Sequence, residues 1–186
     1  MRDLLDKVAA VLTLAENESL TRAAQSDAAA WQQRFGAAAD VSGLWAERNV
    51  LRYLPVPVSV RLGPDASVAS LVRVVAAGML AGSEMRVSVA APLPAAVAAA
   101  MGVFAEVRVA DGESWAAGLA AGRVRLIGGA AADLARATGG RPDLAVWSGP
   151  VTESGRVELL PFLHEQAVSI TAHRFGNPDP LAESVL

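Results

Sequence analysis

The side chains best suited to chemistry lie near the C-terminus of this 186-residue chain, which holds both of its histidines. Combining Ser148 or Ser169 with His164 or His173 would allow a Ser–His–acid hydrolase in principle. No G-x-S-x-G sequence accompanies these serines, so a small hydrolase ranks only as a third hypothesis, to be tested by an esterase screen. His164 is expected in a short helix, as a surface or packing residue.

Metal and thiol chemistry find no support in the sequence. The two histidines are nine residues apart and no H-E-x-x-H sequence is present, so we expect no metal site. The chain has no cysteine, which excludes disulfides, thiolate ligands and a cysteine nucleophile. We therefore predict no catalytic residue.

Two adjacent glycines, Gly128 and Gly129, end an apolar strand and precede a helix. Backbone N–H groups at such a turn can bind a phosphate. However, G-x-G-x-x-G is absent, and a tight turn that needs small residues is the favoured explanation of the pair. Gly128 and Gly129 are thus weak candidates for a cofactor-binding site.

The segment VSITAHR (168–174) alternates in character along an extended strand. One face carries hydrogen-bonding side chains, those of Ser169, Thr171 and His173. The other face carries Val168, Ile170 and Ala172, and Arg174 adds a charged fork suited to a carboxylate. Two interpretations remain open, an ordinary edge strand with a solvated face and a tail that docks on a neighbouring surface.

Strands and helices alternate through the middle of the chain. Strands are predicted at 56–62, 85–90, 104–110, 123–129 and 143–149. Helices are predicted at 67–82, 93–101, 111–121 and 130–138. This order predicts an α/β fold, a Rossmann-like, doubly wound, mainly parallel five-stranded sheet with helices on both faces.

Polar residues on one face of three of these strands indicate an incompletely covered sheet or edge positions. They are Ser59 and Arg61, Arg86 and Ser88, and Glu106 and Arg108.

An N-terminal helical arm and a C-terminal strand-like tail flank this body. One helix is predicted over 3–15, and a second from an N-cap at Ser19 to Gly36, followed by a linker at 37–49. The expected organisation is a helical arm and linker (1–48), a Rossmann-like domain (49–157) and a docking motif (158–186).

The composition of the chain limits the classes of partner that it can bind. The net charge of −3, without a basic run, argues against nucleic acid. No apolar stretch is long enough for a membrane span and no secretory leader is visible, so we expect a cytoplasmic protein.

Two end segments and the region between them resemble a known family. SGLWAERNVLRYLPVPVSVRL (42–62) resembles the start of the C-terminal domain of long bifunctional proline utilization A proteins. VELLPFLHEQAVSITAHRFGNP (157–178) resembles the motif that ends those chains. The units between them, including VRLIGG (124–129), are similar to the nucleotide-binding half of an aldehyde dehydrogenase.

The resemblance implies a non-catalytic domain of an enzyme that converts proline to glutamate with FAD and NAD. Such a domain covers the aldehyde dehydrogenase domain and helps to seal the tunnel through which the intermediate travels. The partner would be that domain, in the same or another polypeptide, and a homo-oligomer is left open. The resemblance implies contact residues Glu165, Gln166, Ser169, Thr171, His173 and Arg174, with Arg52 and Tyr53 as weaker candidates.

The residue content of the chain independently indicates that it cannot perform proline oxidation or aldehyde oxidation alone. An aldehyde dehydrogenase needs a cysteine nucleophile, and a flavin barrel needs about 250 residues of its own. The competing hypothesis is a self-contained nucleotide-binding protein that uses Gly128 and Gly129. Calorimetry with NAD, NADP and adenine nucleotides would separate the two.

Overall fold

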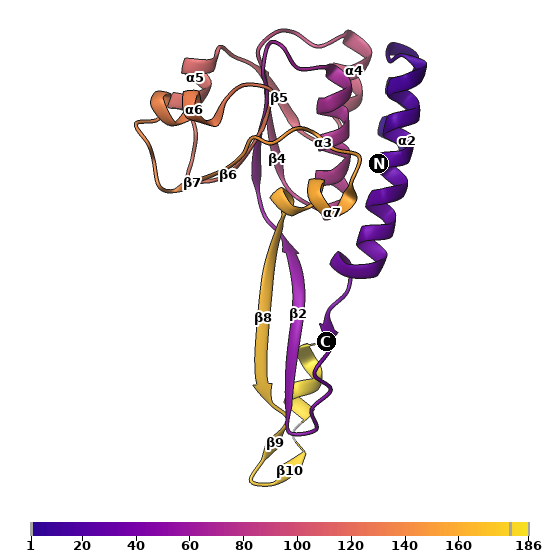
Figure 1. Ribbon diagram of the computed structural model, residues 1–186, viewed down its shortest axis with the longest axis vertical. Coiled ribbons are helices and arrows are strands. Elements are labelled where there is room, and N and C mark those ends of the chain that lie inside the picture. Colours follow the sequence, from indigo (N-terminus) through magenta and orange to yellow (C-terminus); the bar gives the residue numbers. More distant parts are fainter. Residues whose placement is uncertain (1, 179, 186) are drawn as a thin grey trace.

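The computed structural model describes residues 2–178 and 180–185, which form an α/β body with a long β-ribbon projecting from it (Figure 1). No helix in this part of the chain has the length and apolar character needed to cross a membrane. The body contains the predicted sheet and its helices. The ribbon is made by two segments far apart in the sequence.

The body is built on five parallel strands in the spatial order β5-β4-β3-β6-β7. Their bounds are β3 (Val58–Leu62), β4 (Met85–Val89), β5 (Glu106–Val109), β6 (Gly122–Ile127) and β7 (Leu144–Trp147). The chain runs outward from β3 to β5 and then returns to the other side of β3 at β6. The predicted Rossmann-like α/β fold is confirmed, and its topological switch point lies between β3 and β6.

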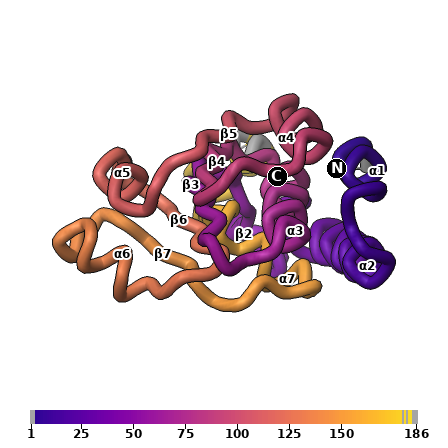
Figure 2. Tube along the Cα trace, turned by 90° about the horizontal axis from the view of Figure 1, so that it is seen from above, coloured from indigo at the N-terminus to yellow at the C-terminus, as the bar shows by residue number. Residues whose placement is uncertain are grey.

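Helices cover both faces of this sheet. They are α3 (Val68–Ala81), α4 (Ala95–Met101), α5 (Gly112–Ala117) and α6 (Ala131–Ala137). In Figure 2, α3 and α4 lie on one side of the sheet and α5 and α6 on the other. Ser67, the first residue of the helix predicted at 67–82, caps α3, because its hydroxyl accepts a hydrogen bond from the Ser70 N–H at 3.1 Å.

The two faces of the sheet differ in the size of the apolar core that they form with their helices. The α3 face holds the main core, which includes Val58, Val60 and Val87. The α5 and α6 face holds a small core whose buried members are Ala116, Leu119, Val124 and Leu134. The second face is therefore incompletely covered over β3 to β5, as the polar residues there indicated. The alternative of edge positions is wrong for β3, which is the central strand.

The N-terminal helices pack outside α3 and α4. They are α1 (Arg2–Val8), the short 3-10 helix η1 (Ala9–Val11), α2 (Leu14–Ala30) and the π-helical turn η2 (Trp31–Phe35). Helix α1 contacts α4, and α2 contacts α3 and the later helix α7 (Gly155–Glu158) (Figure 2).

Two predictions about this region are wrong. The helix expected over 3–15 breaks after η1, and α2 does not start at Ser19. Thr13 caps α2 instead: its hydroxyl accepts a hydrogen bond from the Glu16 N–H, and the Glu16 carboxylate accepts one from the Thr13 N–H. This reciprocal capping box satisfies two backbone donors, an arrangement unavailable to a start at Ser19.

The ribbon consists of β1 (Ala39–Asp40), β2 (Glu47–Pro55) and β8 (Leu163–Thr171), paired antiparallel in that order. The predicted linker at 37–49 is thus partly strand. His164 is not helical as predicted, because α7 and the 3-10 helix η3 (Leu160–Phe162) end before it and β8 begins at Leu163. Two short strands and a 3-10 helix follow, β9 (His173–Arg174), β10 (Asn177–Pro178) and η4 (Pro180–Val185).

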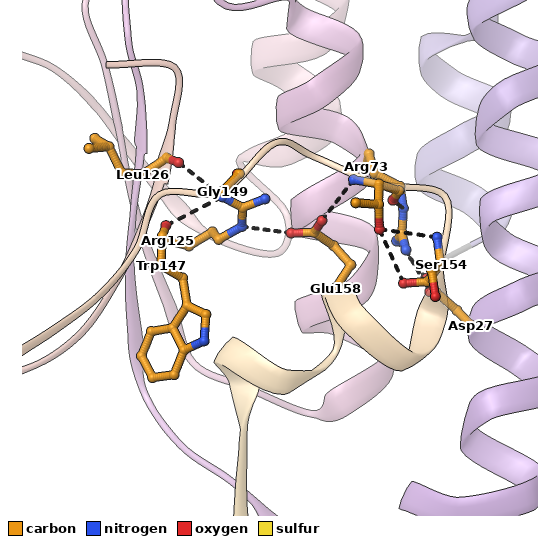
Figure 3. A network of polar contacts seen from close by, with 9 residues as sticks. Asp27, Arg73, Arg125, Leu126, Trp147, Gly149, Ser154 and Glu158 are labelled. Atoms are coloured by element: carbon orange, nitrogen blue, oxygen red, sulfur yellow. Dashed lines mark hydrogen bonds and ion pairs between the residues drawn. The ribbon is translucent and has the colours of Figure 1, made fainter. Parts of the chain in front are cut away.

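Two buried ion pairs join the N-terminal helices, the body and the root of the ribbon (Figure 3). Asp27 in α2 accepts two hydrogen bonds of 2.7 Å from Arg73 in α3. Glu158 in α7 binds Arg125 in β6 at 2.6 Å. The backbone of Thr152 links the pairs, since its carbonyl accepts from Arg73 and its N–H donates to Glu158. All four charged side chains are at least 95% buried.

Candidate protein-docking site

The ribbon that projects from the body (Figure 1) is called here the arm and is defined as residues 39–55 and 163–178. Nine consecutive residue pairs join β2 to β8, from Glu47 opposite Thr171 to Pro55 opposite Leu163. Among the described residues, no strand pairs with the other side of β8. One edge of the arm therefore has backbone groups free to pair with an extended segment of another protein.

Cross-strand hydrogen bonds fix the side chains of the arm. The Tyr53 hydroxyl donates to Glu165 at 2.6 Å. Arg52 donates to Gln166 at 2.7 Å. The Ser169 hydroxyl donates to Asn49 at 2.7 Å. The structure thus brings the weaker candidate Arg52 directly opposite Gln166, and Tyr53 directly opposite Glu165.

The arm is anchored to the body at its root. Arg34, at the end of the α2–η2 helix, donates to the Tyr53 hydroxyl at 3.1 Å, and the Phe35 ring meets the Tyr53 ring edge-on at 4.8 Å. Burial, followed by the hydrogen bond to Glu165, raises the pKa of Tyr53. On the other strand, Arg123 donates to the carbonyl of Leu163 at 2.6 Å. These contacts hold the direction in which the arm leaves the body.

Exposure alternates along β8 and then changes at its end. Ser169 and Thr171 are exposed, while Val168 and Ile170 are half-buried, as the predicted two faces require. His173 departs from the pattern because the chain bends at Ala172, and its ring is half-buried beside the Trp45 indole at 5.8 Å.

The His173 Nδ1 is buried without a hydrogen-bond partner in the described part of the chain. Arg174 is exposed, and its guanidinium lies 5.7 Å from the centre of the Phe175 ring. The last two predicted contact residues therefore lie at the far end of the arm.

Three large apolar side chains at the tip of the arm are strongly exposed. Val41 is 92% exposed, Trp45 78% and Phe175 92%. Phe175 also has a positive φ of 51°, which is uncommon for a bulky residue and fixes a tight turn. Exposed aromatic side chains at the end of a projecting ribbon are typical of a protein-interaction site. Sequence reasoning did not single out Val41 and Phe175, because only their exposure in the fold makes them notable.

The other predicted site residues lie away from the arm. Gly128 and Gly129 follow β6 with positive φ values of 68° and 85°, at the carboxyl edge of the central sheet. In the described chain, neither histidine forms a hydrogen bond with a serine, and Ser169 is bound to Asn49. The serine–histidine pairing of a hydrolase is therefore not assembled. No group of three or more potential metal ligands was found among the described residues.

These features define a Rossmann-like domain with an exposed β-ribbon arm. Comparison with solved structures finds a similar one, Proline Utilization A (PutA) from Corynebacterium freiburgense, at 30% sequence identity and a TM-score of 0.62. The alignment covers 89% of this chain but only 15% of that protein. The likeness supports a PutA-related domain. No protein-family profile and no curated protein matches the sequence.

Proposed function

We propose that this chain is a non-catalytic docking domain of a bifunctional proline-catabolic enzyme. Its arm would cover the aldehyde dehydrogenase domain, in the same or another polypeptide, and help to close the tunnel between the two active sites. The observation that carries the proposal is the arm itself, a nine-pair ribbon with an open strand edge and an exposed aromatic tip. The similarity to part of PutA supports a role within such an enzyme. The aldehyde dehydrogenase domain is proposed as the partner because residues 42–62 and 157–178 resemble the end segments of those proteins.

Under this proposal the chemistry and its cofactors belong to other domains. FAD would serve proline oxidation and NAD the aldehyde oxidation in the parent enzyme. The chain lacks the cysteine that aldehyde oxidation requires. It also lacks G-x-G-x-x-G, and Ala90 follows β4, where Rossmann domains that bind dinucleotides place an acidic residue for the ribose. The cytoplasmic location remains a prediction.

Each part of the arm has a role in the proposal. The open edge of β8 supplies backbone donors and acceptors, which give affinity without demanding a particular sequence. The exposed Ser169, Thr171 and Arg174 would add directional contacts. Trp45 and Phe175 at the tip would supply the apolar anchor, because a few buried aromatic residues usually dominate binding.

Calorimetry between this chain and a separately produced aldehyde dehydrogenase domain of proline utilization A tests the proposal. Binding should weaken by about tenfold or more when Trp45→Ser and Phe175→Asn remove the apolar tip. Leu14→Ser is a matched control, since Leu14 is 76% exposed but lies at the start of α2, outside the arm. Absence of binding, or equal loss in the control, would contradict the proposal.

The same variants should affect coupled turnover. Adding the wild-type chain to catalytic domains that lack it should reduce the escape of the aldehyde intermediate into solution. Deletion of residues 158–186, the simplest truncation suggested by the sequence, is unsuitable because Glu158 and Phe162 are almost fully buried in the body. Substitutions at the exposed tip separate docking from folding.

A further inference from the structure

A pocket of about 420 Å³ opens at the carboxyl edge of the central sheet, at the switch point between β3 and β6. Its volume falls within the range of small-molecule sites. The walls come from the turns after β3, β4 and β6 and from α5 and α6. The walls are mainly apolar, and Trp115, Leu126 and Leu134 are among the side chains that line them.

One buried cation, that of Arg61, lines this pocket. Arg61 is only 4% exposed, although it stands on the central strand β3. Its Nη1 donates to the Ser88 hydroxyl at 2.6 Å, and its guanidinium lies 5.4 Å from the centre of the Trp115 ring. Both partners are neutral. No carboxylate within the described residues forms an ion pair with Arg61, and its Nε and Nη2 have no hydrogen-bond acceptor there.

The two acidic residues in the pocket wall are engaged elsewhere. Asp111 caps α5 and accepts hydrogen bonds from the Ser114 N–H and hydroxyl at 2.8 and 2.7 Å. Asp133 pairs with Arg136 on the next turn of α6. Burial lowers the pKa of Arg61, and the more distant charge of Asp111 opposes that effect only in part. The Arg61 guanidinium therefore faces the pocket without a paired carboxylate among the described residues.

Arg61 differs in this respect from the other buried arginines. Arg73 and Arg125 each face a carboxylate at 2.6 to 2.7 Å. A shielded arginine without a carboxylate partner lowers the free energy of unfolding. A ligand that supplies the missing anion would compensate the charge and stabilise the folded state. An arginine fork matches a carboxylate, because two parallel N–H donors can meet its two oxygens.

We propose that this pocket binds a small carboxylate with a flat apolar body. The carboxylate would bind the free Nε and Nη2 of Arg61, and the apolar body would lie against Trp115 and Leu126. The backbone at the opening of the pocket leaves room for this ligand. A Cβ on Gly129 would meet nothing within 4 Å, so the chain there can lie close to a ligand.

A dinucleotide fits these residues less well. The apolar walls offer few partners for ribose hydroxyls, and Ala90 lines the pocket where a ribose-binding acid would stand. The pocket also lies on the body, away from the arm, so the inference is independent of the docking proposal.

Calorimetry on the full chain with benzoate, and with benzamide as its neutral isostere, tests the proposal. Benzoate should bind at millimolar concentration and benzamide about tenfold or more weakly, because only the anion compensates Arg61. Arg61→Met should abolish the preference for benzoate. Arg86→Met is the matched control, since Arg86 is an exposed arginine on the same sheet face and should leave benzoate binding unchanged.

Thermal unfolding supplies a second readout. Without ligand, Arg61→Met should unfold at the same or a higher temperature than the wild type, because it removes an undercompensated buried charge. Equal binding of benzoate and benzamide, no binding of benzoate, or failure of Arg61→Met to fold would overturn the proposal. Arg61-dependent binding of ADP tighter than that of benzoate would also overturn it, in favour of a nucleotide site.

Discussion

Arg73 and Asp27 face each other through two parallel hydrogen bonds of 2.7 Å in the interior, joining α3 to α2. The Asp27 side chain is fully buried and that of Arg73 is 5% exposed. This ion pair is a fully internal polar connection between the N-terminal helices and the body. Burial raises the pKa of Asp27, and the hydrogen bonds from Arg73 oppose that shift.

Asp27→Ala should lower the free energy of unfolding by about 3–5 kcal/mol, because it leaves the Arg73 charge buried without a partner. The double variant Asp27→Leu/Arg73→Met should recover much of that loss, since it removes both charges. Urea unfolding of the wild type, both single variants and the double variant measures the coupling. Additive effects would show that the two side chains do not act as a pair.

Gly155 permits the close packing of α7 on α2. A Cβ at Gly155 would lie 2.5 Å from the Ser26 carbonyl oxygen and 2.6 Å from the Asp27 Cα, and backbone atoms cannot move aside cheaply. Gly155→Ala should therefore destabilise the chain by about 1–3 kcal/mol or more. Gly149→Ala is the control, since a Cβ there would meet nothing within 4 Å. Thermal unfolding of both variants checks the difference.

Glu153 should make stability depend on acidic pH. Its carboxylate accepts hydrogen bonds from Arg22 and Ser19 in α2, which lower its pKa from 4.5 to about 2. A carboxyl with a depressed pKa stabilises the folded state above the unfolded pKa and loses that contribution as the pH falls. The wild type should exceed Glu153→Gln in urea midpoint at pH 6, and the two should converge towards pH 2. A constant difference across this range would contradict the assignment.

The arm should unfold separately from the body. Val50 in β2 is 1% exposed, yet it belongs to neither core cluster of the body. Val50→Asp should increase hydrogen exchange in β2 and β8 by local unfolding, while β3 and β6 stay protected. Ala167→Asp, at an exposed position of β8, should leave the exchange of the arm nearly unchanged. Loss of protection in β3 would mean that arm and body unfold together.

Local patterns in the sequence predicted much of the body. The alternation of apolar residues located all five parallel strands, and Ser67 marked the start of α3. The same patterns placed Ser169 and Thr171 on one face of an extended segment, but could not show which strand pairs with which. The pairing of β2 with β8 joins residues more than 100 positions apart, so no local signal encodes it. Thr13 and Glu16 did carry a capping signal, which the choice of Ser19 overlooked.

The sequence by itself determined that the chain is an α/β protein without cysteine chemistry, because strand and helix periods and residue types are local properties. Only the tertiary structure decided which charges are compensated. Arg61, Arg73 and Arg125 occupy similar apolar surroundings in the sequence, yet two of them meet carboxylates from distant elements and one faces a pocket. The reason is physical: the energy of a buried charge depends on what lies within a few ångströms of it, and folding alone fixes those neighbours.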